Sequence, residues 1–480
     1  MTTLLSGDLK FKHFLGGKFI SDKPTYDVLN PSNRQNIGQA PSASESLVGD
    51  AVLAAKKAQT EWSRLPANAR GVLLKSLANL IRENLPRLSQ LVSLEQGKVP
   101  ELAQMEVGIA AEYLDYMAGW GRRIEGEVIS SDRPGETMLM FRRPMGVIAA
   151  VLPWNFPFFM VARKMAPALI TGNTIVVKPS EETPFCAAAF AELVAQTEIP
   201  DGVFNMVGGE RKTGELLVAN PDIDMISFTG SSAAGSAIMQ AAGRNLTKVN
   251  LELGGKAPAI IMDDANIDIA AATLAAGKSI NTGQACNCAE RIYVHKDVSE
   301  KFNSALVSAM RDLTFGDPMS QEGLSMGPLI NQNAVKRLEA LVENAKSNGA
   351  DILLGGKAED ETGCHFSPTI LSKTNKNMDI MTAEVFGPVF VVDEIDSLDE
   401  GISRANDSEY GLTSSIFTNN LTSAMTAINE LKFGETYVNR ENFEAIQGFH
   451  AGVKKSGIGG TDGKHGLYEY THTQVAYIQI

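Results

Sequence analysis

One cysteine stands in a setting suited to covalent chemistry. Cys286 follows Gly283 and Gln284 in a turn, after a small-residue run that predicts a helix over 270–280 and before an apolar run that predicts a strand over 292–294. Glycine lets the backbone approach a ligand closely, and a substrate can reach a thiol on such a turn. Because a thiol is a strong nucleophile even when only partly ionised, Cys286 is predicted to be a nucleophile. A small core residue is the alternative.

The other cysteines do not indicate a metal site or a disulfide framework. Cys288 lies two residues after Cys286, a pair that supplies at most half a set of zinc ligands, and Cys186 and Cys364 stand alone. Side chains at i and i+2 are also poor disulfide partners. No metal is therefore expected, with structural zinc and a redox switch as lesser alternatives. Cys288 is expected to be a packing residue.

Two segments that follow predicted strands could hold a nucleotide. Small residues over 228–235, between a strand and a helix, can bind a pyrophosphate through backbone amides and the helix dipole. Lys178 and Glu181 follow another strand, at the edge where open α/β sheets bind ligands. Both can hydrogen-bond ribose hydroxyls, and an acidic residue there repels a 2′-phosphate, which favours NAD over NADP. A plain turn and a solvated Lys–Glu pair are the alternatives.

The elements that must position these residues alternate between strands and helices. Continuous apolar runs predict a parallel, doubly wound sheet covered on both faces, with strands at 147–152, 174–177, 204–207 and 225–228. A second alternation begins at 259 and runs to about 440. The glycine-rich segment 457–463 lacks dinucleotide-binding spacing and a preceding strand, so it is expected to be a loop.

Helical spacing of apolar residues predicts three N-terminal helices, at 44–62, 73–81 and 86–92. Short β-like pieces at 127–129 and 137–141 flank a turn and predict a hairpin that stands apart from the helices. The tail, 471–480, alternates like an edge strand. Because an unpaired edge promotes aggregation, pairing with another subunit is expected.

Composition narrows the class of protein. A chain of 480 residues is long enough for two or three domains, and 44% hydrophobic with 21% charged residues is ordinary for a globular enzyme. A net charge of −13 argues against binding to nucleic acid or to an anionic membrane. The N-terminal residues lack an export signal, and no apolar run is long enough to span a bilayer. A soluble cytoplasmic protein with reduced thiols is expected.

Four motifs, in this order and spacing, resemble the aldehyde dehydrogenase superfamily over nearly the whole chain, at 153–157, 252–256, 283–286 and 384–388. The resemblance is strongest to family members that act on short hydroxyaldehydes, at 287–291, 439–444 and 447–450. It implies an aldehyde dehydrogenase-like α/β fold with a Rossmann-type cofactor domain, an α/β catalytic domain and a β oligomerisation hairpin. The implied boundaries are 1–123 and 146–253 for the NAD-binding domain, 254–440 for the catalytic domain, 124–145 and 467–480 for the oligomerisation segment, and 441–466 for a return to the cofactor domain.

The resemblance also implies chemical roles. Cys286 attacks the aldehyde carbonyl to give a thiohemiacetal, whose oxyanion is stabilised by Asn155 and the Cys286 backbone amide. Hydride transfer to NAD leaves a thioester, and Glu252 is the general base for its hydrolysis. A structural carboxylate before a tight glycine turn is the alternative for Glu252.

Cofactor contacts are implied for residues in or beside the matched motifs. Lys178 and Glu181 match the adenosine-ribose site, Ser231 the pyrophosphate contact, Glu384 the nicotinamide-ribose contact, and Phe386 the residue packed against the nicotinamide. The whole expected set is Trp154, Lys178, Glu181, Gly230, Ser231, Leu253, Glu384 and Phe386.

Three polar residues replace aromatic side chains that many relatives place along the aldehyde tunnel. Counted from the matched motifs, these positions hold Arg163, Glu444 and His450. Buried polar groups are costly unless they find partners, and a hydroxyl beside the aldehyde would supply one. A 2-hydroxyaldehyde such as lactaldehyde or glycolaldehyde is therefore expected. In one alternative the three satisfy one another; in another Arg163 selects a carboxylate, as in succinate semialdehyde, although Glu444 would repel it.

Two further alternatives concern the activity itself. CoA-acylating oxidation has less need of a hydrolytic base such as Glu252, and a catalytically retired structural protein need not keep all four motifs. The resemblance implies a homo-oligomer, either a dimer or a homotetramer, and does not decide between them.

Overall fold

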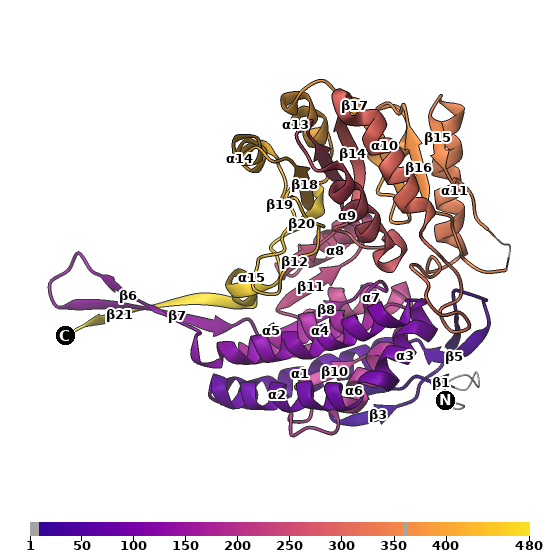
Figure 1. The fold of residues 1–480 in the computed structure, drawn as a ribbon. Coiled ribbons are helices and arrows are strands. Elements are labelled where there is room, and N and C mark those ends of the chain that lie inside the picture. The colour runs from indigo at the N-terminus through magenta and orange to yellow at the C-terminus, as the bar shows by residue number, and fades with distance from the viewer. Residues whose placement is uncertain (1–8, 360–361) are drawn as a thin grey trace.

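The computed structural model describes residues 9–359 and 362–480. Two α/β lobes lie one above the other, and a β-sheet arm projects from the body with the C-terminus near its tip (Figure 1). Within these residues, no helix combines the length and the apolar character needed to cross a bilayer.

The first lobe is built on an eight-stranded sheet in the order β20-β12-β11-β8-β9-β10-β2-β3. Strands β8 to β12 run parallel to their neighbours, whereas β2 and β20 pair antiparallel. The strands are β2 (His13–Leu15), β3 (Lys18–Ile20), β8 (Val147–Val151), β9 (Thr174–Lys178), β10 (Phe204–Met206), β11 (Met225–Thr229), β12 (Lys248–Glu252) and β20 (Gly457–Ile458).

Helices cover both faces of this sheet. Alternate residues of β9 enter different cores: Ile175 and Val177 pack with Phe158, while Val176 packs with Val48. This division confirms the predicted doubly wound arrangement. The helices are α1 (Glu45–Arg64), α2 (Ala67–Glu83), α3 (Leu85–Gln96), α4 (Pro100–Ala118), α5 (Pro157–Ile170), α6 (Pro184–Val194), α7 (Arg211–Ala219) and α8 (Ser232–Ala242).

The prediction of a loop over 457–463 is wrong at its first two residues and at Gly463, where helix α15 (Gly463–Glu469) begins. Gly457 and Ile458 form β20, which pairs with Glu252 and Leu251 at the end of β12. A two-residue strand is too short to show the alternation by which strands are recognised. Its pairing brings the C-terminal part of the chain beside the end of β12.

The second lobe holds a seven-stranded sheet in the order β15-β16-β17-β14-β13-β18-β19, parallel except for β15. Its strands are β13 (Ala257–Ile261), β14 (Ala289–His295), β15 (Asp351–Leu354), β16 (Thr369–Ser372), β17 (Val389–Ile395), β18 (Thr413–Phe417) and β19 (Glu435–Val438). Its helices are α9 (Ile267–Ser279), α10 (Lys296–Arg311), α11 (Gln332–Ser347), α12 (Asp379–Thr382), α13 (Leu398–Asn406) and α14 (Leu421–Glu430).

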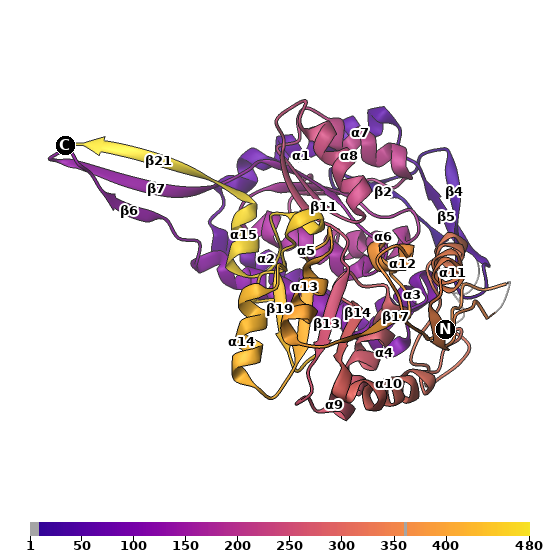
Figure 2. The same ribbon diagram turned by 90° about the horizontal axis from the view of Figure 1, so that it is seen from above.

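The projecting arm is a three-stranded antiparallel sheet in the order β21-β7-β6 (Figures 1 and 2). Its strands are β6 (Glu127–Ser130), β7 (Glu136–Pro144) and β21 (Thr471–Gln479), and α15 (Gly463–Glu469) leads into β21. Val128 and Tyr477 are 78% and 66% exposed on the arm. The remaining elements are β1 (Leu9–Lys10), β4 (Thr25–Leu29), β5 (Asn36–Pro41) and the 3-10 turns η1 (Gly119–Arg122), η2 (Ile280–Gly283) and η3 (Lys454–Ser456).

Candidate functional site

Cys286 lies on a constrained turn between α9 and β14. Asn281 and Thr282 both have positive φ angles, of 49° and 59°, which L-residues seldom adopt. A Cβ at Gly283 would lie 2.2 Å from the Gly387 carbonyl oxygen, so the close approach requires glycine. This strain is concentrated immediately before the half-buried thiol, as is common at functional sites.

Gln284 fixes the same turn from inside the protein. Its side-chain amide donates to the carbonyls of Asn281 and Pro328 at 3.0 and 3.1 Å, and its Oε1 accepts from the Ile330 amide at 2.9 Å. The backbone that carries Cys286 is therefore held from several directions.

Asn155 comes just after β8 and lies against the cysteine turn. Its Nδ2 donates to the Gln284 carbonyl at 3.1 Å. Its own carbonyl accepts from Lys98 Nζ at 2.8 Å and from Asn281 Nδ2 at 3.0 Å. An amide nitrogen has two N–H groups, so Asn155 can point a second donor toward an oxyanion formed at Cys286.

Glu252 ends β12 and is buried. Neither of its carboxylate oxygens has a hydrogen-bond partner among the described residues. Burial raises the pKa of Glu252 to about 7, against the opposing charges of His450, Lys164 and Arg163. A carboxyl with this pKa can exchange a proton with water near neutral pH.

Arg163, Glu444 and His450 lie together. Arg163 Nη2 is 3.0 Å from Glu444 Oε1, and His450 Nδ1 is 4.0 Å from the same oxygen. Asp462 also pairs with Arg163, through a 3.0 Å contact to Nε and a second contact to Nη2. Asn287 Nδ2 donates to Glu444 Oε2 at 2.7 Å. The three predicted residues therefore lie in contact with one another, which is the arrangement that one of the alternatives describes. Asp462 and Asn287 also belong to this cluster.

A cavity of about 240 Å³ opens beside the thiol. Cys286, Asn155, Arg163 and Glu444 all line it. Much of the rest of its wall is apolar, from Met105, Ile109, Phe156, Phe159, Met160, Phe443 and Ile446. A nucleophile, an amide donor and a polar cluster therefore face one space.

The expected cofactor residues gather at the carboxyl ends of β9, β11 and β12. Lys178 Nζ pairs with Glu181 Oε2 at 3.0 Å. Ser231 caps α8, where its hydroxyl accepts from the Ala234 amide at 3.3 Å, next to Gly230. A Cβ at Gly235 of α8 would lie 2.5 Å from the Leu253 side chain.

Residues from the second lobe approach the same edge. Glu384 Oε1 accepts from the Gly255 amide at 2.8 Å. The rings of Phe386 and Trp154 meet edge to face, with centroids 5.5 Å apart. These contacts bring the matched motifs of both lobes together.

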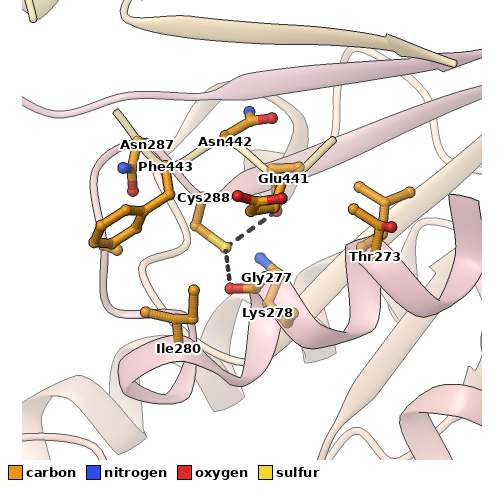
Figure 3. Close-up of a pocket in the computed structure, with 12 residues that line it drawn as sticks. Thr273, Gly277, Lys278, Ile280, Asn287, Cys288, Glu441, Asn442 and Phe443 are labelled. Atoms are coloured by element: carbon orange, nitrogen blue, oxygen red, sulfur yellow. Dashed lines mark hydrogen bonds between the residues drawn. The ribbon is translucent and has the colours of Figure 1, made fainter. Parts of the chain in front are cut away.

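Cys288 lies away from this chemistry. Its buried thiol contacts the carbonyls of Gly277 and Ala289 at 3.7 and 3.6 Å. Figure 3 shows the sulfur pointing toward the backbone of α9, beside a small second pocket near Lys278. Burial raises the pKa of Cys288, which agrees with its expected role as a packing residue.

Sequence reasoning missed several charged residues of the site. Asp462 lay in a segment predicted to be a loop, and no local pattern linked it to Arg163. Lys164 is fully buried, and its Nζ has no hydrogen-bond partner among the described residues. Two adjacent basic residues in the otherwise apolar helix α5 were the available signal. Glu106 accepts from the Phe158 amide at 2.9 Å and so fixes the start of α5.

Comparisons with known proteins agree with this geometry. A model described as "Aldehyde dehydrogenase family" matches residues 19–476. The chain is 51% identical over 469 residues to lactaldehyde dehydrogenase of Escherichia coli (strain K12), covering 97% of this chain and 98% of that protein. It is 38% identical to 3,6-anhydro-alpha-L-galactose dehydrogenase of Vibrio sp. (strain EJY3), covering 98% and 99%.

A crystal structure of lactaldehyde dehydrogenase from Escherichia coli has the same fold, with a TM-score of 0.97. The identity is 51%, and the match covers 98% of this chain and 99% of that one. The predicted fold class is therefore confirmed. With its motifs assembled at one site, this chain belongs to the aldehyde dehydrogenase family of oxidoreductases, which use a nicotinamide cofactor.

Proposed function

We propose that this enzyme oxidises a short 2-hydroxyaldehyde, such as lactaldehyde or glycolaldehyde, to the carboxylate with NAD. The observation that carries this proposal is the polar wall beside Cys286. Arg163, Glu444 and Asn287 line the same cavity as the thiol and are joined by hydrogen bonds. A hydroxyl next to the aldehyde can exchange hydrogen bonds with such a wall, whereas an alkyl group cannot.

The first chemical steps use Cys286 and Asn155, which line the cavity, and the hydrolysis uses the buried Glu252. Cys286 Sγ attacks the carbonyl carbon, and the Asn155 amide with the Cys286 backbone N–H stabilises the resulting oxyanion. Bound NAD supplies the hydride acceptor for this oxidation. Glu252 then takes a proton from water as the water attacks the thioester, which releases the carboxylate and frees the thiol.

The residues at the sheet edge fit a nicotinamide dinucleotide. Lys178 and Glu181 offer a donor and an acceptor for a ribose diol, and the N-terminus of α8 offers backbone amides for a pyrophosphate. Glu384 and Phe386 would hold the nicotinamide ribose and ring. Because Glu181 carries negative charge where a 2′-phosphate would sit, NAD is proposed over NADP. The eight-stranded sheet thereby serves as the cofactor-binding part.

Succinate semialdehyde is the second candidate, because Arg163 could pair with its carboxylate. The charge of Arg163 is already balanced by Asp462 and Glu444. A third carboxylate would have to compete with Asp462 and Glu444 for this guanidinium. The hydroxyaldehyde is therefore ranked first.

We also propose that the enzyme is a homo-oligomer, joined through the arm formed by β6, β7 and β21. The arm extends from the body (Figure 2). It exposes apolar side chains, including Val128 and Tyr477. Apolar side chains on a projecting sheet are typical of a surface that another subunit covers.

Initial rates of NADH formation test the substrate and the cofactor together. We expect kcat/KM for lactaldehyde and glycolaldehyde to exceed that for propanal by about 10-fold or more, since a lost hydrogen bond costs roughly 1–3 kcal/mol. NAD should be preferred to NADP. A preference for succinate semialdehyde would instead assign Arg163 to carboxylate binding. Equal rates with propanal would contradict the polar-wall proposal.

A further inference from the structure

A chain of polar side chains leads from Glu252 to strand β19. His450 Nε2 lies 3.9 Å from Glu252 Oε2, and His450 Nδ1 lies 3.1 Å from Glu435 Oε1. The Tyr437 hydroxyl donates to Glu435 Oε2 at 2.6 Å. Glu435 and Tyr437 are two residues apart on β19 and so share one face of the strand. The contacts connect the buried base to the edge strand of the second sheet.

The backbone holds His450 in this position. Its amide donates to the Thr461 carbonyl at 2.9 Å, and its carbonyl accepts from the Thr461 amide at 2.8 Å. The side chain is only 2% exposed. The imidazole is therefore fixed between two carboxylates, Glu252 and Glu435, and responds to their charges.

Charges on several elements act on His450 and on Glu252. Burial lowers the pKa of His450, but Glu444, Cys286 and Glu435 raise it well above its ordinary value, against Arg163. Glu444, Cys286 and Glu435 therefore favour the protonated, positively charged imidazole. The charged or titratable groups that act electrostatically on Glu252 or respond to its charge are His450, Lys164, Arg163, Asp462 and Tyr470. Among the cations that oppose the effect of burial on Glu252, His450 is the strongest.

We propose that Glu435 and Tyr437 are positioning residues for thioester hydrolysis, because they hold the His450 imidazole in place beside the Glu252 carboxylate. The inference rests on the proposed role of Glu252 as the hydrolytic base. In the described part of the chain, Glu435 and Tyr437 are not among the residues that line the aldehyde cavity. Their effect on hydrolysis is therefore separable from substrate binding.

The test is the pH dependence of kcat in the Glu435→Gln enzyme, with glycolaldehyde and with propanal. Loss of the Glu435 charge lowers the pKa of His450, so the imidazole becomes neutral at a lower pH and Glu252 loses its cation. The carboxyl of Glu252 then stays protonated to higher pH. We expect the acid limb of kcat to move up by about half to one pH unit with both aldehydes. The KM values should stay unchanged.

The pre-steady-state burst of NADH gives a second readout. If hydrolysis alone is slowed, the burst amplitude should grow in Glu435→Gln at pH values below the shifted limb. Glu430→Gln, which removes an exposed carboxylate at the end of α14, makes the same charge change and should show neither effect. Tyr437→Phe should shift the acid limb of kcat in the same direction by a smaller amount. If Glu435→Gln does not fold, the Tyr437→Phe enzyme is used for the same measurement.

An unchanged acid limb and an unchanged burst in both β19 variants would overturn this inference alone. A Glu252→Gln enzyme that hydrolyses the thioester normally would instead overturn the role of Glu252, and this inference with it. Because the pH shift is measured with both aldehydes, it does not depend on which one the enzyme prefers.

Discussion

Glu252 combines burial with the absence of a hydrogen-bond partner among the described residues. Burial raises its pKa to about 7, so below that pH the carboxyl is protonated and cannot take a proton from water. We expect kcat, at saturating aldehyde and cofactor, to rise with pH through about 7. Initial rates over a range of pH check this expectation.

The Glu252→Gln enzyme supplies the matched control for that pH profile. It should lose about 10²- to 10⁴-fold in turnover, the usual effect of removing a general base, and the acid limb should disappear. Cys286 would still be acylated, so one equivalent of NADH should form rapidly. If kcat of the Glu252→Gln enzyme still rises through pH 7, the acid limb is due to the titration of a group other than Glu252.

At the scale of elements, the Arg163 ion pairs tie α5 to the segment that precedes β21. Arg163 and Asp462 have side chains only 5% and 2% exposed. Arg163→Ala would leave the carboxylates of Asp462 and Glu444 buried without their cation, which typically costs about 3–5 kcal/mol. We expect a loss of that size in the free energy of unfolding, measured by urea denaturation.

The comparison variant is Arg211→Ala on α7. Arg211 pairs with Glu215 at 2.8 Å, but its side chain is 85% exposed. An exposed pair contributes roughly 0–1 kcal/mol, so this change should be nearly neutral. Similar losses in both variants would contradict the idea that the buried cluster joins the two elements.

The elements that could be predicted from sequence are those with long, regular apolar patterns. Buried strands such as β8 and β9 appear as continuous apolar runs, and α1 shows helical spacing over its whole length. Strand β20 could not be predicted, because its two residues pair only through contacts distant in sequence. The residues around 457–458 give no information about pairing with β12, which lies far away in the sequence.

The residues of the site also fall into those that could be predicted from sequence and those that could not. Cys286, Glu252 and Asn155 stand in motifs that a reader of the sequence can recognise, and in the structure Cys286 and Asn155 line one cavity. Asp462, Glu435 and Lys164 are ordinary charged residues in sequence, and only the fold makes them neighbours of these groups. The domain boundaries, which follow from resemblance, stay a prediction.

At the scale of the whole molecule, the arm should determine assembly. Tyr477 and Val128 are its most exposed large apolar residues apart from the terminal Ile480. Replacing Tyr477 and Val128 with glutamate places charge on the proposed contact surface, which is costly to bury. By light scattering, we expect the double variant to be a monomer and the parent protein to be a dimer or a tetramer.

Leu246 offers a matched control, because it is 91% exposed on the body between α8 and β12. Leu246→Glu should leave the assembly unchanged. If the double variant in the arm keeps the parent's mass, the arm is not the contact surface.

The pairing of α5 with the C-terminal segment has a consequence for how the chain is made. Arg163 leaves the ribosome long before Glu444, His450 and Asp462, so a growing chain carries its guanidinium without the carboxylates that later balance it. Strand β20 likewise joins the first sheet only near the end of synthesis. During translation the thiol of Cys286 therefore exists before its polar wall is complete. The unfinished chain therefore carries the thiol without Glu444 and Asp462, the carboxylates that pair with Arg163.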